Sequence, residues 1–427
     1  MQSQRTWLGT PGPGRSVGSR AQIPELQQRQ RRAVSLKLRE AKKDEQVFER
    51  RNITSLSTDP ASQEETIWVS LTVPEMISGM NASDPESCFQ AAQAARRILS
   101  EQRNPPVKLT VEAGLIPRLM AFLRSSHAPC LQFEAAWALT NISAESSEQT
   151  HTTVEGGAIQ PLVELLSSPH MNVCKHAVLA LGNTAGDGPE FRDVISSNAI
   201  PCLLALISLT TPVAFLQHIM RTLSYLCLKE GPQPCQMAVK PMLSILSCLL
   251  RHQDSEVLCY TCRALSYLTE VCDGHIGQVV DMLVLPRLVE LMTSSKFDIL
   301  GHFQVQKDAI CAVANFVSGG TLDQMIQLIH SGVLEPLVNL LTIPDMNVVI
   351  NVLDIIFLLL QATMESLPEL PEIESLCVPM EERGRLDRIK ALQYHENRQI
   401  ALTTQSMLWC LGLDLQKASK FSAGSQE

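Results

Sequence analysis

The clearest chemical signal in this chain is a set of polar and aromatic residues at intervals of 42, namely Asn141, Asn183, Tyr225 and Tyr267. Each ends a related stretch; these read WALTN, LALGN, RTLSY and RALSY, and a fifth relative, CAVAN, ends at Asn315. Trp137 lies four residues before Asn141, so the two side chains share one face of a helix. A column of Asn amides can hold a peptide backbone, and a neighbouring indole offers a wall for a lysine stem and its charge. The spacing therefore predicts a peptide-binding groove.

The elements that position these residues follow from the same period. A repeat near 42 residues is typical of a stacked helical solenoid. Five apolar stretches each carry a proline near their start, at Pro117, Pro161, Pro201, Pro286 and Pro336. Proline is tolerated in the first turn of a helix, where its missing N–H costs nothing. Each unit is predicted to be a short helix, a proline-opened helix and a longer third helix, which is an armadillo pattern rather than a two-helix HEAT pattern. We expect an all-α, right-handed armadillo-repeat superhelical solenoid over residues 72–410.

Within the third helix, the spacing of side chains separates core from ligand positions. Ala136, Leu139 and Ile142 follow the helical period and are predicted to face the core, while Trp137 and Asn141 point elsewhere. Taken alone, a helical Trp is more often a core residue than a ligand wall. The groove interpretation therefore depends on the recurrence of the pattern.

The period breaks once. Tyr267 and Asn315 are 48 residues apart, and residues 293–309 begin as the second helix of one repeat and end as the third helix of another. Solenoid units contact only their neighbours, so whole repeats can be lost without destroying the array. We interpret residues 293–304 as the junction left by loss of two central repeats.

Charge and composition divide the rest of the chain. Residues 1–28 are rich in Gly, Pro, Ser and Gln and are predicted to be disordered. A basic helical segment is predicted over 29–52, a linker over 53–71 and a disordered tail over 411–427. Residues 1–51 have a formal charge of +7, which leaves −16 for the remainder of a chain whose net charge is −9. A basic arm thus precedes an acidic body.

Several classes of function are disfavoured by these features. An acidic body does not suit nucleic acid as the main ligand. The 13 cysteines are scattered through apolar helical stretches, and Cys259 and Cys262 are expected to be buried thiols rather than a metal or redox pair. No signal-peptide core is visible, and the longest apolar run, around Ile355–Leu360, is too short to cross a bilayer. We expect no catalytic residue, metal or cofactor, no membrane insertion and an intracellular protein.

The sequence resembles the importin-α (karyopherin-α) family, and most closely its alpha-8 branch, over about residues 30–400. The stretches that carry the resemblance are EAAWALTNIS, EGGAIQPLVELLSSP, ALGNTAGDGPEFRD, ALSYLTE, HSGVLEPLVNLL and ALQYHENRQI. The segment VSLKLREAKKDEQVFERRN is similar to the family's importin-β-binding region. The resemblance implies an adaptor in cytoplasm and nucleus that binds the nuclear localisation signals of cargo proteins and links them to importin-β.

Carried over residue by residue, the resemblance implies a major cargo site at Trp137, Asn141, Thr150, Asn183 and Asp193. In this mapping the carboxylate of Asp193 holds the key lysine with help from Thr150. Glu145 stands where the family has a glycine of the same pocket. A minor-site remnant is expected at Asp308 and Asn315.

The departures from the family pattern predict a reduced site. Leu179, Arg221, Arg263 and Cys311 replace tryptophans, and Tyr225 replaces an asparagine. Leu and Cys remove the aromatic wall, and Arg places positive charge in a groove meant for cations. Bipartite signals, which need both sites at a set separation, are expected to bind poorly.

The basic arm carries its own expectations. Its candidate importin-β contacts are Arg31, Arg32, Lys37, Arg39, Lys42, Lys43, Arg50 and Arg51. The family's Lys-Arg-Arg-Asn motif, which mimics cargo, begins here with Glu49, so weak self-inhibition is expected. Residues from Gly384 to about Ile400 resemble the part of the family that binds the export receptor.

Three hypotheses are consistent with these residues. The first is a nuclear-import adaptor with a reduced, mainly monopartite cargo site. The second is a non-transporting scaffold or decoy that binds importin-β without carrying cargo. The third, a catenin-like scaffold, needs a basic groove for acidic partners and is disfavoured by the acidic body.

Overall fold

The computed structural model describes residues 71–100, 105–228, 236–271, 284–293, 299–366 and 385–410, which are helical with short turns and contain no strand. The importin-β-binding-like segment, its eight basic residues, Glu49 and the predicted tail over 411–427 lie outside these ranges.

The helices in the first half of the chain are 6 to 17 residues long. They are α2 (Val73–Met80), α3 (Pro85–Leu99), α4 (Val107–Glu112), α5 (Leu115–Leu123), α6 (Pro129–Glu145), α7 (Ser147–Glu155), α8 (Ile159–Leu165), α9 (Met171–Asp187), α10 (Pro189–Ala205) and α11 (Val213–Leu226). The second half continues with α12 (Gln236–Leu249), α13 (Ser255–Val271), α15 (Val284–Thr293), α16 (Ile299–Gly319), α17 (Leu322–His330), α18 (Leu334–Leu340), α19 (Met346–Ser366), α21 (Arg385–Leu392) and α22 (Arg398–Cys410).

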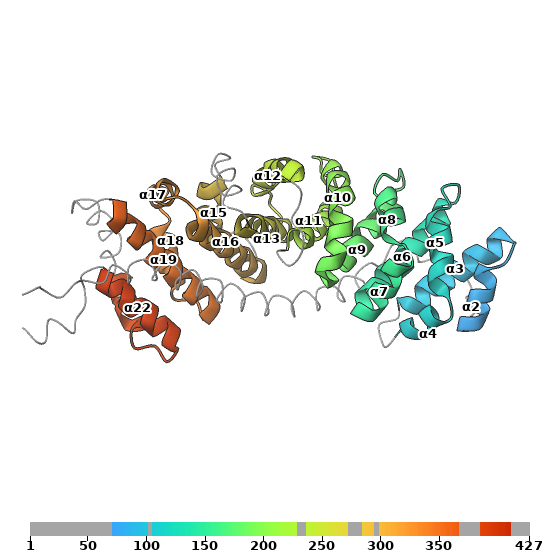
Figure 1. The fold of residues 1–427 in the computed structure, drawn as a ribbon, viewed down its shortest axis with the longest axis horizontal. Coiled ribbons are helices and arrows are strands. Elements are labelled where there is room, and N and C mark those ends of the chain that lie inside the picture. Colours follow the sequence, from blue (N-terminus) through green and yellow to red (C-terminus); the bar gives the residue numbers. More distant parts are fainter. Residues whose placement is uncertain are drawn as a thin grey trace, which may run out of the picture. The chain divides into compact units, whose positions relative to one another are not determined.

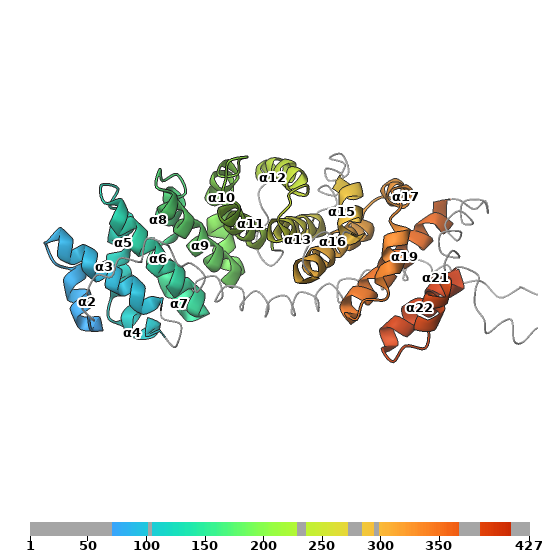
Figure 2. The same ribbon diagram turned by 180° about the vertical axis from the view of Figure 1, so that it is seen from behind.

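The longest helix of each repeat packs on its counterpart in the next repeat. Figure 1 shows these third helices as one series, in the order α3, α6, α9, α11, α13, α16, α19 and α22, and each contacts its successor. In Figure 2 the second helices, such as α5, α8 and α15, lie along the upper edge of the array, above the third helices. The third helices thus bring the residues spaced by 42 into register. This arrangement confirms the armadillo prediction.

Three glycines create the turn between the first and second helices of a repeat. Gly114, Gly157 and Gly332 have φ values of 90°, 81° and 79°, a left-handed conformation that other residues rarely adopt. In the repeat that follows that of Gly157, Asn198 stands at the corresponding position, and α10 is a single continuous helix of 17 residues. The predicted three-helix unit is therefore wrong for this repeat, because the residue that would break the helix is missing.

The predicted repeat junction, residues 293–304, extends from the last residue of α15 into the start of α16. α15 packs against α16, and α16 packs between α13 and α19. Residues 294–298, between α15 and α16, lie outside the described ranges. The second helix of one unit and the third helix of another thus form a composite repeat that continues the series.

The interior consists mainly of Leu, Ile, Val and Ala. Ala136, Leu139 and Ile142 are fully buried in α6, as their spacing predicts. Thr321 and Gln324 form a reciprocal capping box at the start of α17, with the Thr321 N–H donating to Gln324 Oε1 at 2.9 Å. Within the described ranges, none of the helices combines the length and apolar character needed to span a membrane. The same ranges hold no group of His, Cys, Asp and Glu arranged for a metal ion.

Candidate functional site: a ladder on the third helices

The conserved spacing of the asparagines reflects a contact made once per repeat. Each Asn side chain donates its amide hydrogen to the third helix of the preceding repeat or to its end. Asn141 Nδ2 donates to Ser100 Oγ at 2.8 Å, Asn183 Nδ2 to the Thr140 carbonyl at 3.1 Å and Asn315 Nδ2 to the Ser266 carbonyl at 2.7 Å. This contact fixes the orientation of the amide, and at Asn141 and Asn183 it leaves the amide oxygen and the second amide hydrogen for other partners.

The amide oxygens of Asn141 and Asn183 have different surroundings. Asn183 Oδ1 accepts a long hydrogen bond from Arg221 Nη2 at 3.5 Å. The residue that corresponds to Arg221 one repeat earlier is Leu179, which has no donor. Asn141 Oδ1 is accordingly buried without a hydrogen-bond partner. A buried acceptor without a donor costs free energy, so Asn141 is prepared to accept an N–H from a peptide.

We call the third-helix positions of Trp137, Leu179, Arg221, Arg263 and Cys311 the wall positions. Only the first carries an aromatic side chain, and that indole is already in contact on both sides. The His176 ring from α9 stacks on Trp137 at 4.5 Å between centroids and 15° between planes, and the Arg96 guanidinium from α3 lies 4.4 Å from its centroid. Trp137 is 7% exposed. The expected wall for a lysine stem is therefore occupied by the protein's own side chains.

Arg96 and His176 are themselves held in place by burial and charge. Arg96 Nε forms an ion pair with Glu134 Oε2 in α6. Burial raises the pKa of Glu134, and the charge of Arg96 acts in the opposite direction. Burial lowers the pKa of His176 to about 3, helped by the positive charges of Lys175, His218 and Arg96. His176 is thus a neutral ring at ordinary pH.

Helix α7 makes contacts at the ends of two third helices, α6 and α9. Thr150 is fully buried, and its hydroxyl donates to the Ser143 and Ser146 carbonyls at 3.3 and 3.1 Å. Ser147, in the same helix α7, donates from Oγ to Asp187 Oδ1 at 3.0 Å. Asp187 is the last residue of α9, where the carbonyl end of the helix dipole adds negative potential.

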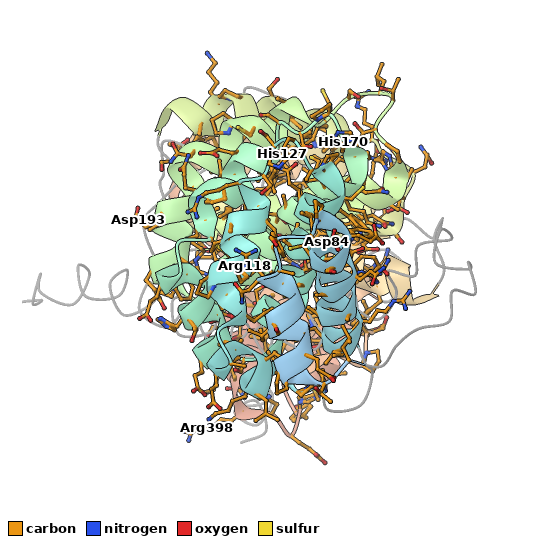
Figure 3. The ribbon with its side chains drawn as sticks, turned by 90° about the vertical axis from the view of Figure 1, so that its right-hand side faces the viewer. Asp84, Arg118, His127, His170, Asp193 and Arg398 are labelled. Carbon is orange, nitrogen blue, oxygen red and sulfur yellow. The ribbon has the colours of Figure 1, made fainter. Side chains whose placement is uncertain are left out.

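The expected pairing of Asp193 with Thr150 is not seen. Asp193 lies in α10, which begins after Gly188, the residue that ends α9. Its side chain is exposed. Figure 3 shows Asp193 at the margin of the projection, pointing outward. Asp187 is an alternative carboxylate, because it follows Asn183 by four residues on the same face of α9. The signal for Asp187 was available in the sequence as this spacing of four.

The minor-site prediction for Asp308 is contradicted by its surroundings. Asp308 is fully buried, and its Oδ2 accepts from Arg263 Nη2 at 3.2 Å, Cys259 Sγ at 3.0 Å and Gln304 Nε2 at 3.3 Å. Arg263 therefore neutralises this carboxylate and does not leave a positive charge in the groove. Asn315 is half-buried and keeps the amide contact described above.

Family models agree with this architecture. The model described as "Importin beta binding domain" matches residues 20–93, and that described as "Armadillo/beta-catenin-like repeat" matches residues 103–144 and 146–186. The crystal structure of an engineered protein superposes with a TM-score of 0.64 at 24% identity, over 87% of this chain and 96% of that one. Together they define an armadillo-repeat protein preceded by an importin-β-binding domain. The match to that domain extends on both sides of the predicted segment 29–52.

Curated relatives identify the family. Importin subunit alpha-8 of Mus musculus is 41% identical over 460 aligned residues, covering 88% of this chain and 90% of the mouse protein. Importin subunit alpha-5 of Arabidopsis thaliana is 33% identical, covering 90% and 89%. Importin subunit alpha-1b of Oryza sativa is 39% identical, and the aligned part spans 49% of its length. The chain belongs to the importin α family, whose members are transport adaptors that shuttle between cytoplasm and nucleus. Its architecture is that of a nuclear import adaptor that binds importin-β.

Proposed function

We propose that this adaptor carries proteins with short, monopartite nuclear localisation signals, and that it holds their key lysine between Asn141 and Asp187. The groove acts by binding alone and needs neither catalysis nor a cofactor. Importin-β binds through the basic arm, with Arg31, Arg32, Lys37, Arg39, Lys42, Lys43, Arg50 and Arg51 as the proposed contacts. The adaptor works in cytoplasm and nucleus, and the C-terminal repeat is the proposed contact for the export receptor.

The observation that carries this proposal is the pair formed by an unsatisfied acceptor and a carboxylate at one end of the ladder. Asn141 Oδ1 is buried without a donor, and Asp187 lies at the carbonyl end of α9 beside Ser147. A peptide N–H satisfies the first, and a lysine ammonium pairs with the second in a charge-assisted hydrogen bond.

The same geometry explains why the site is reduced. Arg96 and His176 cover the two faces of Trp137. A cargo lysine must displace one of them or bind without the indole. A cation over an exposed aromatic ring contributes about 0.5–1 kcal/mol, so losing this contact weakens the site by a few-fold without abolishing it.

The two candidate carboxylates provide a matched test. Fluorescence anisotropy of a labelled monopartite peptide should show Asp187→Asn binding at least tenfold more weakly than wild type, because the lysine loses its counter-charge. Asp193→Asn removes the same charge a few residues away and should bind the peptide as wild type does. Equal losses, or a loss confined to Asp193→Asn, would overturn the assignment to Asp187.

Importin-β binding separates the adaptor from the decoy. Both variants should retain importin-β, because its proposed contacts lie in the arm. If wild type captures importin-β and shows no measurable affinity for the peptide, the protein is a decoy and the cargo proposal fails.

A further inference from the structure

The groove contains three buried or nearly buried arginines, and two of them have a carboxylate partner. Arg96 pairs with Glu134, and Arg263 pairs with Asp308 at 3.2 Å. Arg221, on α11, is 1% exposed and has no ion pair in the described part of the chain. Its Nε and Nη1 also have no hydrogen-bond partner.

The register of the repeats explains why Arg221 has no such partner. Glu134 and Asp308 each lie three residues before a wall position. Each of these carboxylates belongs to the third helix that follows the helix of its arginine. In α13, which follows α11, the same register is occupied by Tyr260, three residues before Arg263. Where the other two arginines find a carboxylate, Arg221 therefore has a tyrosine.

The surroundings of Arg221 are positively charged. Burial, helped by the charges of Arg221 and Lys175, lowers the pKa of His218 to about 3. The same Lys175 acts on His176. The part of the groove formed by α9 and α11 thus attracts anions, although the body of the chain is acidic overall.

Burying a guanidinium with unsatisfied donors is unfavourable. The planar fork of Arg fits a carboxylate with two parallel hydrogen bonds. The existing bond from Arg221 to Asn183 is 3.5 Å long, at the outer limit for a hydrogen bond. Little is lost when the guanidinium turns toward a better acceptor.

We infer that Arg221 receives a glutamate or aspartate side chain of the bound peptide, so that this groove prefers peptides that join a basic cluster to one acidic residue. An extended peptide rises about 3.3 Å per residue and packed helices are about 8–10 Å apart, so each repeat faces roughly three peptide residues. Arg221 lies two repeats beyond Asn141, which is the proposed contact of the peptide backbone at the lysine. The acidic residue should therefore lie about six residues from that lysine. The inference rests on the proposed function for the position of that lysine.

The test uses the full chain and four labelled peptides. Two carry the basic cluster with Glu six residues before or after the key lysine, and one carries Gln at both positions. The fourth carries Glu and no basic residue. For wild type, one of the two Glu peptides should bind at least fivefold more tightly than the Gln peptide. Arg221→Met should lose this preference and bind the Glu and Gln peptides with equal affinity.

Arg251→Met is the matched control, because Arg251 is exposed in the turn after α12. It should keep the preference for Glu. Circular dichroism melting checks that each variant is folded, and Arg221→Lys should keep part of the preference through its charge.

No preference for Glu in wild type, or a preference that persists in Arg221→Met, would overturn the inference. If no basic peptide binds, the proposed function fails, and the peptide with Glu and no basic residue still tests Arg221. Wild type should bind this peptide measurably at low salt, and Arg221→Met should not. If wild type does not bind it, or if Arg221→Met binds it equally well, Arg221 is not an acidic-residue site.

Discussion

At the scale of single residues, the groove is defined by what its side chains already contact. Trp137, expected to face a cargo lysine, lies between Arg96 and His176. Asp308, expected to be an acidic contact, is neutralised by Arg263. Asn141 keeps an unsatisfied acceptor because Leu179 replaces a donor in the next repeat. The side chains at the wall positions therefore decide which groove residues remain available to bind a ligand.

His176 makes the stability of this region depend on pH. Its pKa is about 3 in the folded protein and about 6.5 when unperturbed. Above pH 6.5 both states are neutral and the full stability is present. As the pH falls from 6.5 toward 3, the unfolded state takes up a proton and the native state does not. The free energy of unfolding should fall by up to about 1.4 kcal/mol per pH unit from this residue.

Urea unfolding at several pH values checks this. His176→Gln should show a shallower fall in the free energy of unfolding between pH 6 and 4. His127→Gln changes an exposed histidine and should keep the wild-type slope. Identical slopes for wild type and His176→Gln would show that His176 is protonated in the native state.

At the scale of elements, the contact between third helices depends on small residues. Gly182 in α9 faces α11, and a Cβ placed there would lie 2.4 Å from Thr222 Oγ1. Thr222 is fully buried and donates to the Val178 carbonyl at 3.1 Å. The side chain therefore has no space into which to move, and the two helices are set at the distance that glycine permits.

Gly182→Ala should destabilise the protein by about 1–3 kcal/mol through overpacking. The sign of the change in the free energy of unfolding is informative, because a Gly→Ala change in an exposed helix interior stabilises a protein by up to about 1 kcal/mol. Chemical unfolding measures the effect. In a Thr222→Ala background, the added Gly182→Ala change should cost clearly less, since the clashing hydroxyl is gone. An equal cost in both backgrounds would place the strain elsewhere.

At the scale of the whole molecule, we infer that the array has fewer units than mouse importin subunit alpha-8. The alignment of the two is 460 positions long, and the part of this chain that it covers, 88%, is shorter than that by roughly two 42-residue repeats. The composite repeat formed by α15 and α16 lets the series of third helices continue across the gap. The groove is correspondingly shorter between the major site and Asn315.

A bipartite signal peptide should therefore gain little over a monopartite one. The carboxylate that would bind its second basic cluster, Asp308, is already paired with Arg263. The distance between the two sites is also expected to be shorter than such a peptide requires. Fluorescence anisotropy should show a gain below tenfold, about 1.4 kcal/mol. The control peptide carries the second cluster with its lysines replaced by serine. A gain well above tenfold over this control would show that a second basic site has survived.

The sequence by itself determined the fold and the family. The 42-residue period, the proline-opened helices and the apolar spacing of α6 are local features, and local features suffice when each repeat packs only on its neighbours. The same period placed Asn141 and Asn183 on a common ladder. The resemblance to the importin-α family further predicted a reduced cargo site, because Leu179 and Arg221 stand where the family has tryptophans.

Only the tertiary structure decided which of these residues remain available for a ligand. The partners of Trp137, Asn183 and Asp308 come from neighbouring repeats, about 40 to 50 residues away along the chain. No local pattern reveals such a pairing, because it depends on how two helices are set against each other. The proposed choice of Asp187 over Asp193 has the same origin, since Gly188 ends α9 and Asp193 belongs to the next helix, α10. The spacing of the repeats therefore determines where the groove side chains lie, and contacts between repeats determine which of them can bind a ligand.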